Sequence, residues 1–389
     1  MRIAIDLTAT PKNKTGIGRY ILNLVQGLQV VDKDNQYVLF VHSDDVDGFR
    51  VFAPNFRIVS VDSRVLRKTF IRIVWEQVVF PFRLRKEHID VLHSPNFSIP
   101  YLGRFVWARL HRVVTFHDMT YFFLPEFHIG WKREFFKNYI RLSARVADQI
   151  ITISNNSRKD IPLYCKPGNP RIQVTHLGVD QRFFMSEPAS DAMKKRYGIQ
   201  GKYILYVGTL EPRKNIPRLI EAYEQLPDQL KDQYKLVLSG KKGWLYDEIF
   251  TALKRKPELL DRVVFTGFVD DSDLPSLVRS ATVFAYVSIY EGFGIPVIEA
   301  MACGVPTITS RGSSLEEIAG DGAMIVDPLN VCSIRQGLER LLTDSEYALE
   351  LSQRGLIQAR KYKWEQCASD TLLAYQAAFG KHGNVGLEK

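Results

Sequence analysis

A chain of 389 residues is longer than one ordinary domain, and two domains are the simplest expectation. Hydrophobic residues make up 46% of it and charged residues 24%, which is a globular composition. The most apolar run, residues 70–82, is interrupted by Arg72 and Glu76, so it falls short of the roughly 18 apolar residues of a membrane span. The four cysteines are scattered without a CxxC pair, which favours free thiols over disulfides or metal ligands. The opening MRIAIDLTAT is typical of a strand rather than a signal peptide, and we therefore expect a cytoplasmic protein.

The net charge of +9 is unevenly distributed along the chain. Residues 1–185 hold 27 Lys and Arg against 16 Asp and Glu, whereas the remaining residues hold 25 against 27. A basic first half attracts anionic partners over a long range. Anionic lipid, a lipid-phosphate acceptor and nucleic acid are the candidates, and an ordinary solvated basic surface is the alternative.

In the first half, apolar runs of four to six residues alternate with longer amphipathic stretches, which is the pattern of βαβ units around a parallel sheet. Helical periodicity covers residues 17–29 and 131–147. Six strands are predicted here, at residues 3–6, 37–41, 56–61, 89–94, 112–118 and 149–154.

A polar, turn-rich stretch without periodicity follows at residues 177–202 and predicts a linker. The alternation then restarts, and an amphipathic helix is predicted at residues 363–379. The predicted fold class is therefore α/β, with two Rossmann-like doubly wound parallel sheets and a ligand at the carboxyl ends of the strands, in the cleft between the domains. The second set of strands is predicted at residues 203–208, 235–240, 262–267, 282–287, 306–310 and 322–326.

Two glycine-containing loops follow predicted strands. In TGIGRY, residues 15–20, Gly16 and Gly18 precede a helix whose N-terminus attracts anions, although the spacing is not GxGxxG and a structural turn explains it nearly as well. In GTLEPRKN, Gly208 turns the chain after a strand and is followed by Arg213 and Lys214. Such a cation pair at the end of a strand can clamp a diphosphate, and a solvated basic loop is the alternative.

The stretch SIYEGFGIPVIEAMACGVPTITS, residues 288–310, places two acids in a small and apolar segment. Glu291 precedes a predicted helix that begins near Pro296, and Glu299 lies within it. Carboxylates accept hydrogen bonds from sugar hydroxyls, and a helix N-terminus attracts phosphate. We therefore interpret the two acids as holding two hydroxyl-bearing groups on either side of a phosphate. A favourable acid near a helix start explains one glutamate but not both.

Histidines end two strands of the first half. His117, in TFHDMT, is predicted to face the ligand cleft and to donate a hydrogen bond to a sugar hydroxyl or to backbone, and a structural role is the alternative. The same argument applies to His93 with less force. The aspartates at 44–45 and 270–273 do not form the ligand cluster of a metal centre, and no metal is predicted.

These motifs together resemble the retaining glycosyltransferases of family 4, which have the GT-B fold. The resemblance covers nearly the whole chain and is strongest in GTLEPRKN, LSGKKGW, VVFTGFVDDSDL and the E-x7-E motif from Glu291 to Glu299. It implies an acceptor-binding domain at residues 1–180 and a donor-binding domain at 196–362. It also implies that a final helix, at about 363–380, packs back onto the first domain.

The resemblance also implies a role for each motif residue. Glu291 and the amides of Phe293 and Gly294 would bind the donor sugar or its distal phosphate, and Glu299 would hold the ribose. Arg213 and Lys214 would grip the diphosphate, with Gly16 and Gly18 facing it from the other domain and His117 near the reacting carbon. Gly267, Phe268 and Val269 would lie along the nucleobase. The catalytic set is thus His117, Arg213, Lys214 and Glu291, with Gly208 among the donor-binding residues.

The implied reaction is transfer of a sugar with retention of configuration, by front-face attack and without a metal or other cofactor. The sequences TGIGRY and GTLEPRKN resemble those of bacterial mannosyltransferases of polysaccharide assembly. The expected donor is therefore GDP-mannose, and a UDP-sugar is the second candidate. The expected acceptor is a lipid-linked or polysaccharide glycan. The basic and aromatic stretches at 64–75 and 130–145 would rest on an anionic membrane surface, or else form solvated helix faces over a core.

Other functions fit the same sequence less well. A nucleotide-sugar epimerase would share the fold but release an altered sugar without an acceptor. A glycogen phosphorylase would need a cofactor lysine and a longer chain. A basic nucleic-acid-binding protein would leave the two glutamates unexplained, so no nucleic-acid partner is expected.

Overall fold

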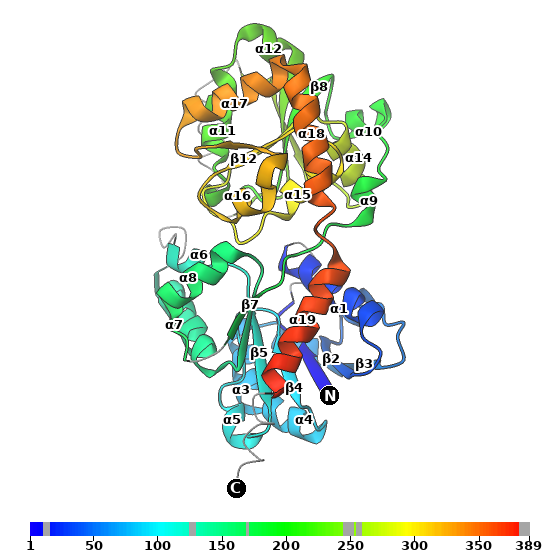
Figure 1. The fold of residues 1–389 in the computed structure, drawn as a ribbon, viewed down its shortest axis with the longest axis vertical. Coiled ribbons are helices and arrows are strands. Elements are labelled where there is room, and N and C mark those ends of the chain that lie inside the picture. The colour runs from blue at the N-terminus through cyan, green and yellow to red at the C-terminus, as the bar shows by residue number, and fades with distance from the viewer. Residues whose placement is uncertain (11–15, 124–129, 169–170, 244–252, 254–258, 381–389) are drawn as a thin grey trace. The chain divides into compact units, whose positions relative to one another are not determined.

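The computed structural model describes all residues except 11–15, 124–129, 169–170, 244–252, 254–258 and 381–389 (Figure 1). The chain divides into two compact units. Unit 1 comprises Met1–Gly178 and Trp364–Lys389, and unit 2 comprises Val179–Lys363. Each unit is built on a parallel sheet, which confirms the predicted α/β class with two such domains. None of the described helices is long and apolar enough to cross a membrane.

Unit 1 contains a seven-stranded sheet in the order β3-β2-β1-β4-β5-β6-β7, with every neighbouring pair parallel. The central strands are fully buried and read as apolar runs, as strands covered on both faces must. The order reverses between β1 and β4, which is where such sheets bind ligands. The strands are β1 (Arg2–Asp6), β2 (Gln36–His42), β3 (Phe56–Val61), β4 (Val91–Ser94), β5 (His111–Phe116), β6 (Gln149–Thr152) and β7 (Arg171–Val174).

The last helix of the chain belongs to unit 1. It is α19 (Trp364–Phe379), which lies along α1 (Ile17–Val31) and contacts β4, β5 and β6 (Figure 1). The two helices approach closely at Gly27, where an added Cβ would lie 2.9 Å from the carbonyl oxygen of Trp364 and 3.0 Å from the Cβ of Ala368. A glycine at this position therefore permits the close packing of α19 on α1.

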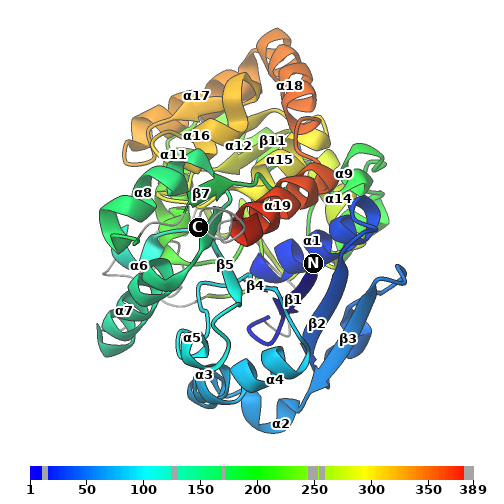
Figure 2. The same ribbon diagram turned by 60° about the horizontal axis from the view of Figure 1, so that its bottom comes forward.

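The other helices of unit 1 surround its sheet (Figure 2). One core cluster lies under α3 and α4, where Trp75 stacks on Phe80 with ring centroids 4.8 Å apart and Phe80 meets Phe40 of β2 edge-on at 4.9 Å. The helices are α2 (Ser63–Leu66), α3 (Thr69–Val78), α4 (Phe80–Lys86), α5 (Gly103–Val106), α6 (Thr120–Phe123), α7 (Gly130–Val146) and α8 (Asn155–Cys165), together with the 3-10 turn η1 (Val46–Gly48).

Unit 2 contains a six-stranded parallel sheet in the order β10-β9-β8-β11-β12-β13. Here the order reverses between β8 and β11, which pair through Val283 with Ile204 and Phe284 with Leu205. The strands are β8 (Lys202–Val207), β9 (Tyr234–Ser239), β10 (Val263–Gly267), β11 (Val283–Tyr286), β12 (Thr307–Ser310) and β13 (Met324–Val326).

The helices of unit 2 are mostly short, and several begin at a polar side-chain cap. Asn330 accepts from the amide of Ser333, and Asp344 accepts from that of Tyr347. The helices are α9 (Gln181–Phe184), α10 (Asp191–Arg196), α11 (Ile216–Glu224), α12 (Asp228–Gln233), α14 (Leu274–Arg279), α15 (Ile295–Ala302), α16 (Ser314–Ala319), α17 (Val331–Thr343) and α18 (Ser345–Ala359), with the turns η3 (Pro212–Lys214) and η5 (Gly320–Gly322).

The structure differs from the sequence-based expectation in three segments. Unit 1 has a seventh strand, β7, which was not predicted because its residues are only partly buried at the sheet edge and form no apolar run. Residues 177–202 were expected to lack periodic structure but carry α9 and α10, capped by Asp180 and Ser190. The sequence predicts only an interrupted apolar stretch at 70–82, whereas these residues form most of α3 and the start of α4.

Candidate active site

The candidate site of unit 2 is built on the two loops that follow β8 and β11. These strands are neighbours at the point where the strand order reverses, so their carboxyl ends open the crevice in which doubly wound sheets bind ligands. The β8 loop carries Arg213 and Lys214 in η3, and the β11 loop carries Glu291. Sequence segments more than seventy residues apart thus meet at one edge of the sheet.

Backbone and amide hydrogen bonds fix the two loops against each other. The amide of Ile289 donates to the carbonyl oxygen of Arg213 over 2.8 Å. Asn215, which has a left-handed φ of 61°, donates from its side-chain amide to the carbonyl oxygens of Val287 at 3.0 Å and Pro328 at 2.6 Å. Because asparagine tolerates this conformation better than most residues, it suits the position. The cation pair is therefore held in place by neighbouring backbone.

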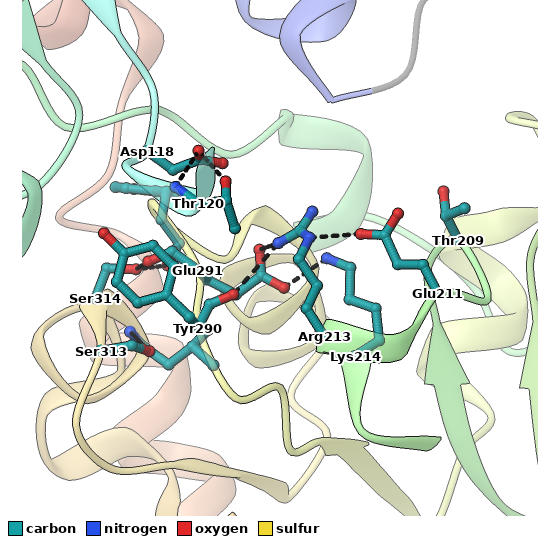
Figure 3. Close-up of polar contacts among 12 residues, drawn as sticks. Asp118, Thr120, Thr209, Glu211, Arg213, Lys214, Tyr290, Glu291, Ser313 and Ser314 are labelled. Atoms are coloured by element: carbon teal, nitrogen blue, oxygen red, sulfur yellow. Dashed lines mark hydrogen bonds and ion pairs between the residues drawn. The ribbon is translucent and has the colours of Figure 1, made fainter. Parts of the chain in front are cut away.

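Both cations converge on one carboxylate (Figure 3). Arg213 donates from Nη1 to Oε2 of Glu291 at 2.7 Å and to the carbonyl oxygen of Tyr290 at 3.3 Å. Lys214 donates from Nζ to Oε1 of Glu291 at 2.5 Å and to the hydroxyl of Tyr286 at 2.7 Å. Both oxygens of the carboxylate are therefore bound to a cation.

A second carboxylate and a tyrosine complete the cluster. Oε1 of Glu211 lies 2.5 Å from Nε of Arg213, so the guanidinium is paired with Glu211 through Nε and with Glu291 through Nη1. The hydroxyl of Tyr286 also donates to Glu291 over 3.1 Å. Two cations and two carboxylates leave the cluster without net charge, and charge-assisted bonds of this kind define the positions of its side chains.

Burial and pairing oppose each other in the pKa values of the cluster. Burial raises the pKa of Glu291, but Arg213 and Lys214 outweigh it and hold the pKa at about 2. Burial also lowers the pKa of Lys214, and the neighbouring Arg213 lowers it further. For Glu211, burial outweighs the attraction of Arg213 and raises the pKa. At neutral pH Glu291 is consequently a carboxylate, able to accept hydrogen bonds but not to donate a proton.

The loop after Glu291 leads directly into α15. Gly294 is the residue before the helix and has a φ of 108°, a conformation that favours glycine. The hydroxyl of Ser314 donates to the carbonyl oxygens of Glu291 at 2.6 Å and Phe293 at 3.2 Å and so fixes this turn. Glu299 lies in α15 and is 95% buried, as deep as a core residue. The predicted helix start between the two acids is confirmed.

The glycine after β8 allows a close backbone approach. Gly208 follows β8, and the backbone of Gly240 after β9 lies directly against it: an added Cβ on Gly240 would be 1.9 Å from the carbonyl oxygen of Gly208. Gly240 also has a φ of 147°. These two glycines thus bring adjacent strand ends together beside the loop that carries Arg213 and Lys214.

The predicted nucleobase segment lies at the end of β10. Gly267 has a left-handed φ of 69°, Val269 is buried, and Phe268 is exposed. The ammonium of Lys241 lies 4.4 Å from the centroid of the Phe268 ring, a cation–π contact. Contact of this segment with a nucleobase stays a prediction.

The site residues predicted in unit 1 lie at the helix start after β1 and at the end of β5. Gly16 is the exposed residue before α1, and Gly18 is buried in its first turn. His117 follows β5 and is buried, with Nε2 2.8 Å from the carbonyl oxygen of Pro95. Burial lowers its pKa, so the ring is neutral at pH 7 and Nε2 carries the proton given to Pro95. His117 therefore donates to backbone, one of the two hydrogen bonds that the sequence predicted for it, and offers Nδ1 as an acceptor.

His93 has a structural environment. Its Nδ1 lies 2.7 Å from the hydroxyl of Tyr375, and its Nε2 lies 2.7 Å from Oγ1 of Thr115. Burial lowers the pKa of His93 to about 3. Both ring nitrogens are thus engaged inside unit 1, in line with the lesser weight that the sequence gave this residue.

Sequence reasoning missed two members of the cluster. Glu211 lies inside the quoted motif GTLEPRKN but received no role, and Tyr286 was read only as part of a strand. An acid two residues before an arginine in a loop after a strand is the signal that could have found Glu211. The pairing of Glu291 with the two cations was also missed, because the sequence treated them as separate ligand-binding groups. Among the described residues, no group of three or more His, Cys, Asp or Glu could hold a metal ion; independence from metal stays a prediction.

Known proteins match the chain along almost its whole length. The family described as "Glycosyl transferases group 1" matches residues 190–357, and "Glycosyltransferase Family 4" matches residues 14–183. O-antigen chain mannosyltransferase B of Escherichia coli is 35% identical over 375 residues, which are 93% of this chain and 96% of that relative. The serotype-specific mannosyltransferase WbdA of Escherichia coli is 31% identical over 374 residues, 89% of this chain but 43% of WbdA. Sucrose-phosphate synthase from Thermosynechococcus elongatus has a TM-score of 0.74 at 20% identity, covering 98% of this chain and 99% of that one.

Two Rossmann-like units with this similarity to a solved synthase define the GT-B class of fold. The chain is also 35% identical to a mannosyltransferase over nearly the full length of both proteins. It therefore belongs to the family 4 glycosyltransferases. The resemblance drawn from the sequence motifs is thereby confirmed, and the protein is an enzyme of the glycosyltransferase class.

Proposed function

We propose that this enzyme transfers mannose from GDP-mannose to a hydroxyl of a lipid-linked or polysaccharide acceptor, with retention of anomeric configuration. The observation that carries the proposal is the convergence of Arg213 and Lys214 on Glu291 at the reversal point of the unit 2 sheet. The relatives named as O-antigen chain mannosyltransferase B and WbdA support mannose as the sugar and a glycan as the acceptor.

The cation pair accounts for departure of the leaving group. As the anomeric bond breaks, negative charge grows on the nucleoside diphosphate. Arg213 and Lys214 are held by Glu211, Glu291 and Tyr286 before any ligand arrives, so they stabilise this charge without reorganisation. The N-terminus of α15, after Gly294, adds a second positive end for phosphate.

Glu291 acts in this scheme as a hydrogen-bond acceptor. Its low pKa keeps it ionised, and hydroxyls of the donor sugar donate to it. Two cations reduce the nucleophilicity of the same carboxylate, which favours front-face attack by the acceptor hydroxyl with a donor phosphate oxygen as the base. Glu299 holds the ribose hydroxyls, and neutral His117 accepts from a sugar hydroxyl through Nδ1. A glycosyl adduct trapped on Glu291 would contradict this route.

Unit 1 supplies the acceptor side in this proposal. Its excess of basic residues supports association of the enzyme with the inner face of the cytoplasmic membrane, where a lipid-linked acceptor is found. The enzyme uses the nucleotide sugar as a co-substrate and needs no metal or other cofactor.

A ligand panel tests the donor. Thermal unfolding is followed with GDP, UDP, ADP, CMP and their common sugars, each with and without EDTA. A ligand at about 100 times its dissociation constant adds roughly 2.7 kcal/mol of stability, so GDP and GDP-mannose should raise the melting temperature in the presence of EDTA, and Glu299→Ala should remove the shift. If UDP alone raised the melting temperature, GDP-mannose would be refuted as the donor and a UDP-sugar would be indicated. NMR of the product then assigns its anomeric configuration, and an inverted product would refute retention.

A further inference from the structure

Helix α3 of unit 1 exposes large apolar side chains while it buries a charged one. It buries Glu76 and Gln77 beside Ile73 and Trp75, and it exposes Phe70, Ile71 and Val74. An ordinary surface helix turns its apolar side to the core and its charged side to water. The core of unit 1 therefore does not account for the exposed Ile71 and Val74 of α3.

The polar side of α3 is satisfied from within unit 1. Glu76 accepts hydrogen bonds from Nη1 of Arg72 at 2.9 Å, from the hydroxyl of Ser98 at 3.1 Å and from the hydroxyl of Tyr139 at 3.1 Å. Gln77 donates to the carbonyl oxygen of Ile99 at 3.1 Å. The orientation of α3 is thus fixed by buried polar bonds and by Trp75 in the core, and the helix cannot roll to hide its apolar side without breaking them.

Helix α4 packs against both α3 and α5 (Figure 2), and all three helices carry exposed apolar side chains. An added Cβ on Gly103 of α5 would lie 3.3 Å from Pro81 of α4, so these two helices are in direct contact. Of the twenty large hydrophobic side chains that are most exposed among the described residues, eight fall between residues 69 and 106. We call six of them the α3–α5 face: Phe70, Ile71, Val74, Val78, Phe82 and Phe105, of which Phe70 also contacts the ring of Phe135 on α7, with centroids 5.8 Å apart.

Basic residues outnumber acids in the segment that carries most of this face. Residues 63–86 contain seven Lys and Arg but one acidic residue, Glu76, which is fully buried and paired with Arg72. Lys68 at the start of α3, and Arg83, Arg85 and Lys86 at the end of α4, are exposed. Exposed apolar side chains flanked by cations are the combination that binds the interface of an anionic bilayer.

The second basic and aromatic stretch, residues 130–145, behaves differently. It forms α7, in which Ile140 and Ala144 are buried and Glu134, Asn138 and Arg145 face water. This is the ordinary amphipathic arrangement of a helix over a core. The two stretches have similar sequences, but α3 exposes apolar side chains whereas α7 exposes mainly polar ones.

We propose that the α3–α5 face docks on the surface of an anionic lipid bilayer, with α3 lying in the interface. The ten residues of α3 extend about 15 Å, half of a hydrocarbon core, so the helix lies on the membrane and does not cross it. A second copy of the chain is the poorer occupant, because a two-fold interface would bring the cations of one face against those of the other. The inference deepens the proposed function, since it names the surface through which the enzyme reaches a lipid-linked acceptor.

Vesicle flotation tests the docking. The full chain is mixed, without nucleotide or acceptor, with vesicles of phosphatidylcholine alone or with about 30% phosphatidylglycerol. The wild type should float with the anionic vesicles only. Val74→Ser combined with Phe82→Ser should lower the bound fraction by about tenfold or more, because it removes apolar area from the interface. Equal flotation of the wild type and this variant, or no flotation of the wild type, would overturn the proposal.

Matched controls lie on unit 2. Ile357, on α18, is 62% exposed, as is Val74, and Ile357→Ser combined with Leu349→Ser should leave flotation unchanged. Sedimentation of the proteins without vesicles tests whether a second copy of the chain occupies this face. A dimer that is dissociated by Val74→Ser combined with Phe82→Ser would refute membrane docking in favour of self-association. A nucleotide thermal shift on the same preparations separates a failure of docking from a failure of the proposed transferase activity, because it needs no membrane.

A fluorescent label gives a measurement that does not depend on loss of binding. Cys332 is exposed, whereas Cys165, Cys303 and Cys367 are buried. An environment-sensitive dye is placed at Phe82→Cys in a Cys332→Ser background, and on native Cys332 as the control. Anionic vesicles should shift the emission to the blue at position 82 and not at position 332. A shift at 332 with none at 82 would place the membrane contact elsewhere and refute the assigned face.

Discussion

Nδ1 of His93 on β4 lies 2.7 Å from the hydroxyl of Tyr375 on α19, although 282 residues separate the two in the chain. On its other side, His93 meets Thr115, whose hydroxyl also lies 3.1 Å from that of Tyr20. The row of four polar side chains is wholly buried and crosses from α19 through the sheet to α1. Because buried polar groups need their partners, this row fixes α19 on unit 1 more specifically than apolar packing alone.

Removing the hydroxyl of Tyr375 should therefore destabilise unit 1. Tyr375→Phe leaves one nitrogen of a buried neutral imidazole without its partner, which costs about 1–3 kcal/mol. The measurement is the free energy of unfolding in urea. The exposed Leu373 on the same helix provides a control, since Leu373→Ala should change this free energy by no more than about 0.5 kcal/mol. Equal effects of the two substitutions would show that the buried row contributes nothing specific.

Gly240 should tolerate no side chain. A Cβ there would overlap the carbonyl oxygen of Gly208, and its φ of 147° is nearly exclusive to glycine. We expect Gly240→Ala to lower the free energy of unfolding by about 3 kcal/mol or more. Gly201 has a φ of 73° with open space around it, so Gly201→Ala should cost only the conformational strain of about 1–2 kcal/mol. Similar losses in both variants would mean that β8 and β9 separate easily beside the site.

The two cations should differ in what their removal does. Arg213→Ala should lower kcat by about 100- to 1,000-fold through loss of charge stabilisation in the transition state. Lys214→Ala should add a stability loss of about 3–5 kcal/mol, because it breaks a buried ion pair. Steady-state kinetics and urea unfolding measure the two effects. Arg335→Ala, on the surface of α17, is the control and should alter neither quantity appreciably. If Arg213→Ala kept the wild-type kcat, Arg213 would have no role in stabilising the transition state.

Glu76 should make stability depend on pH. Burial raises its pKa to about 7, above an unfolded value near 4.5, so the folded state binds the extra proton between these values. The associated stability is fully present below about pH 4.5 and is lost as the pH rises to about 7, by an amount on the order of a few kcal/mol. Urea unfolding between pH 5 and about 8 should show this decline in the wild type and a smaller one in Glu76→Gln. An identical decline in the variant would assign it to another group.

Much of the fold was predictable because strands buried in a parallel sheet consist of runs of apolar residues. β2 and β5 were found within two residues of their ends for that reason, whereas β7 escaped because its side chains at the sheet edge are only partly buried. The sequence could not predict which side chains of α3 are exposed, because the same residues form a helix whether its apolar side chains face the core or the solvent. Only the positions of Glu76 and Tyr139 in space decide between the two.

The site was predictable residue by residue but not as a cluster. Arg213, Lys214 and Glu291 each stood out from their neighbours in the sequence. Their contact depends on β8 and β11 becoming neighbours in the sheet, and no local pattern encodes that adjacency. Glu211 was overlooked for the same reason, because its importance lies in the guanidinium it contacts.

The assignment of α19 to unit 1 sets an order on biosynthesis. Residues 179–363 form a unit whose last residue leaves the ribosome before any residue of α19 does, so the chain of unit 2 is complete outside the ribosome before that of unit 1. Unit 1 begins the chain yet lacks the partner of α1 and of His93 until residue 375 has emerged. The half that is synthesised first is thus the half that is completed last, and a chain that ended after residue 363 would contain all of unit 2 but a unit 1 without α19.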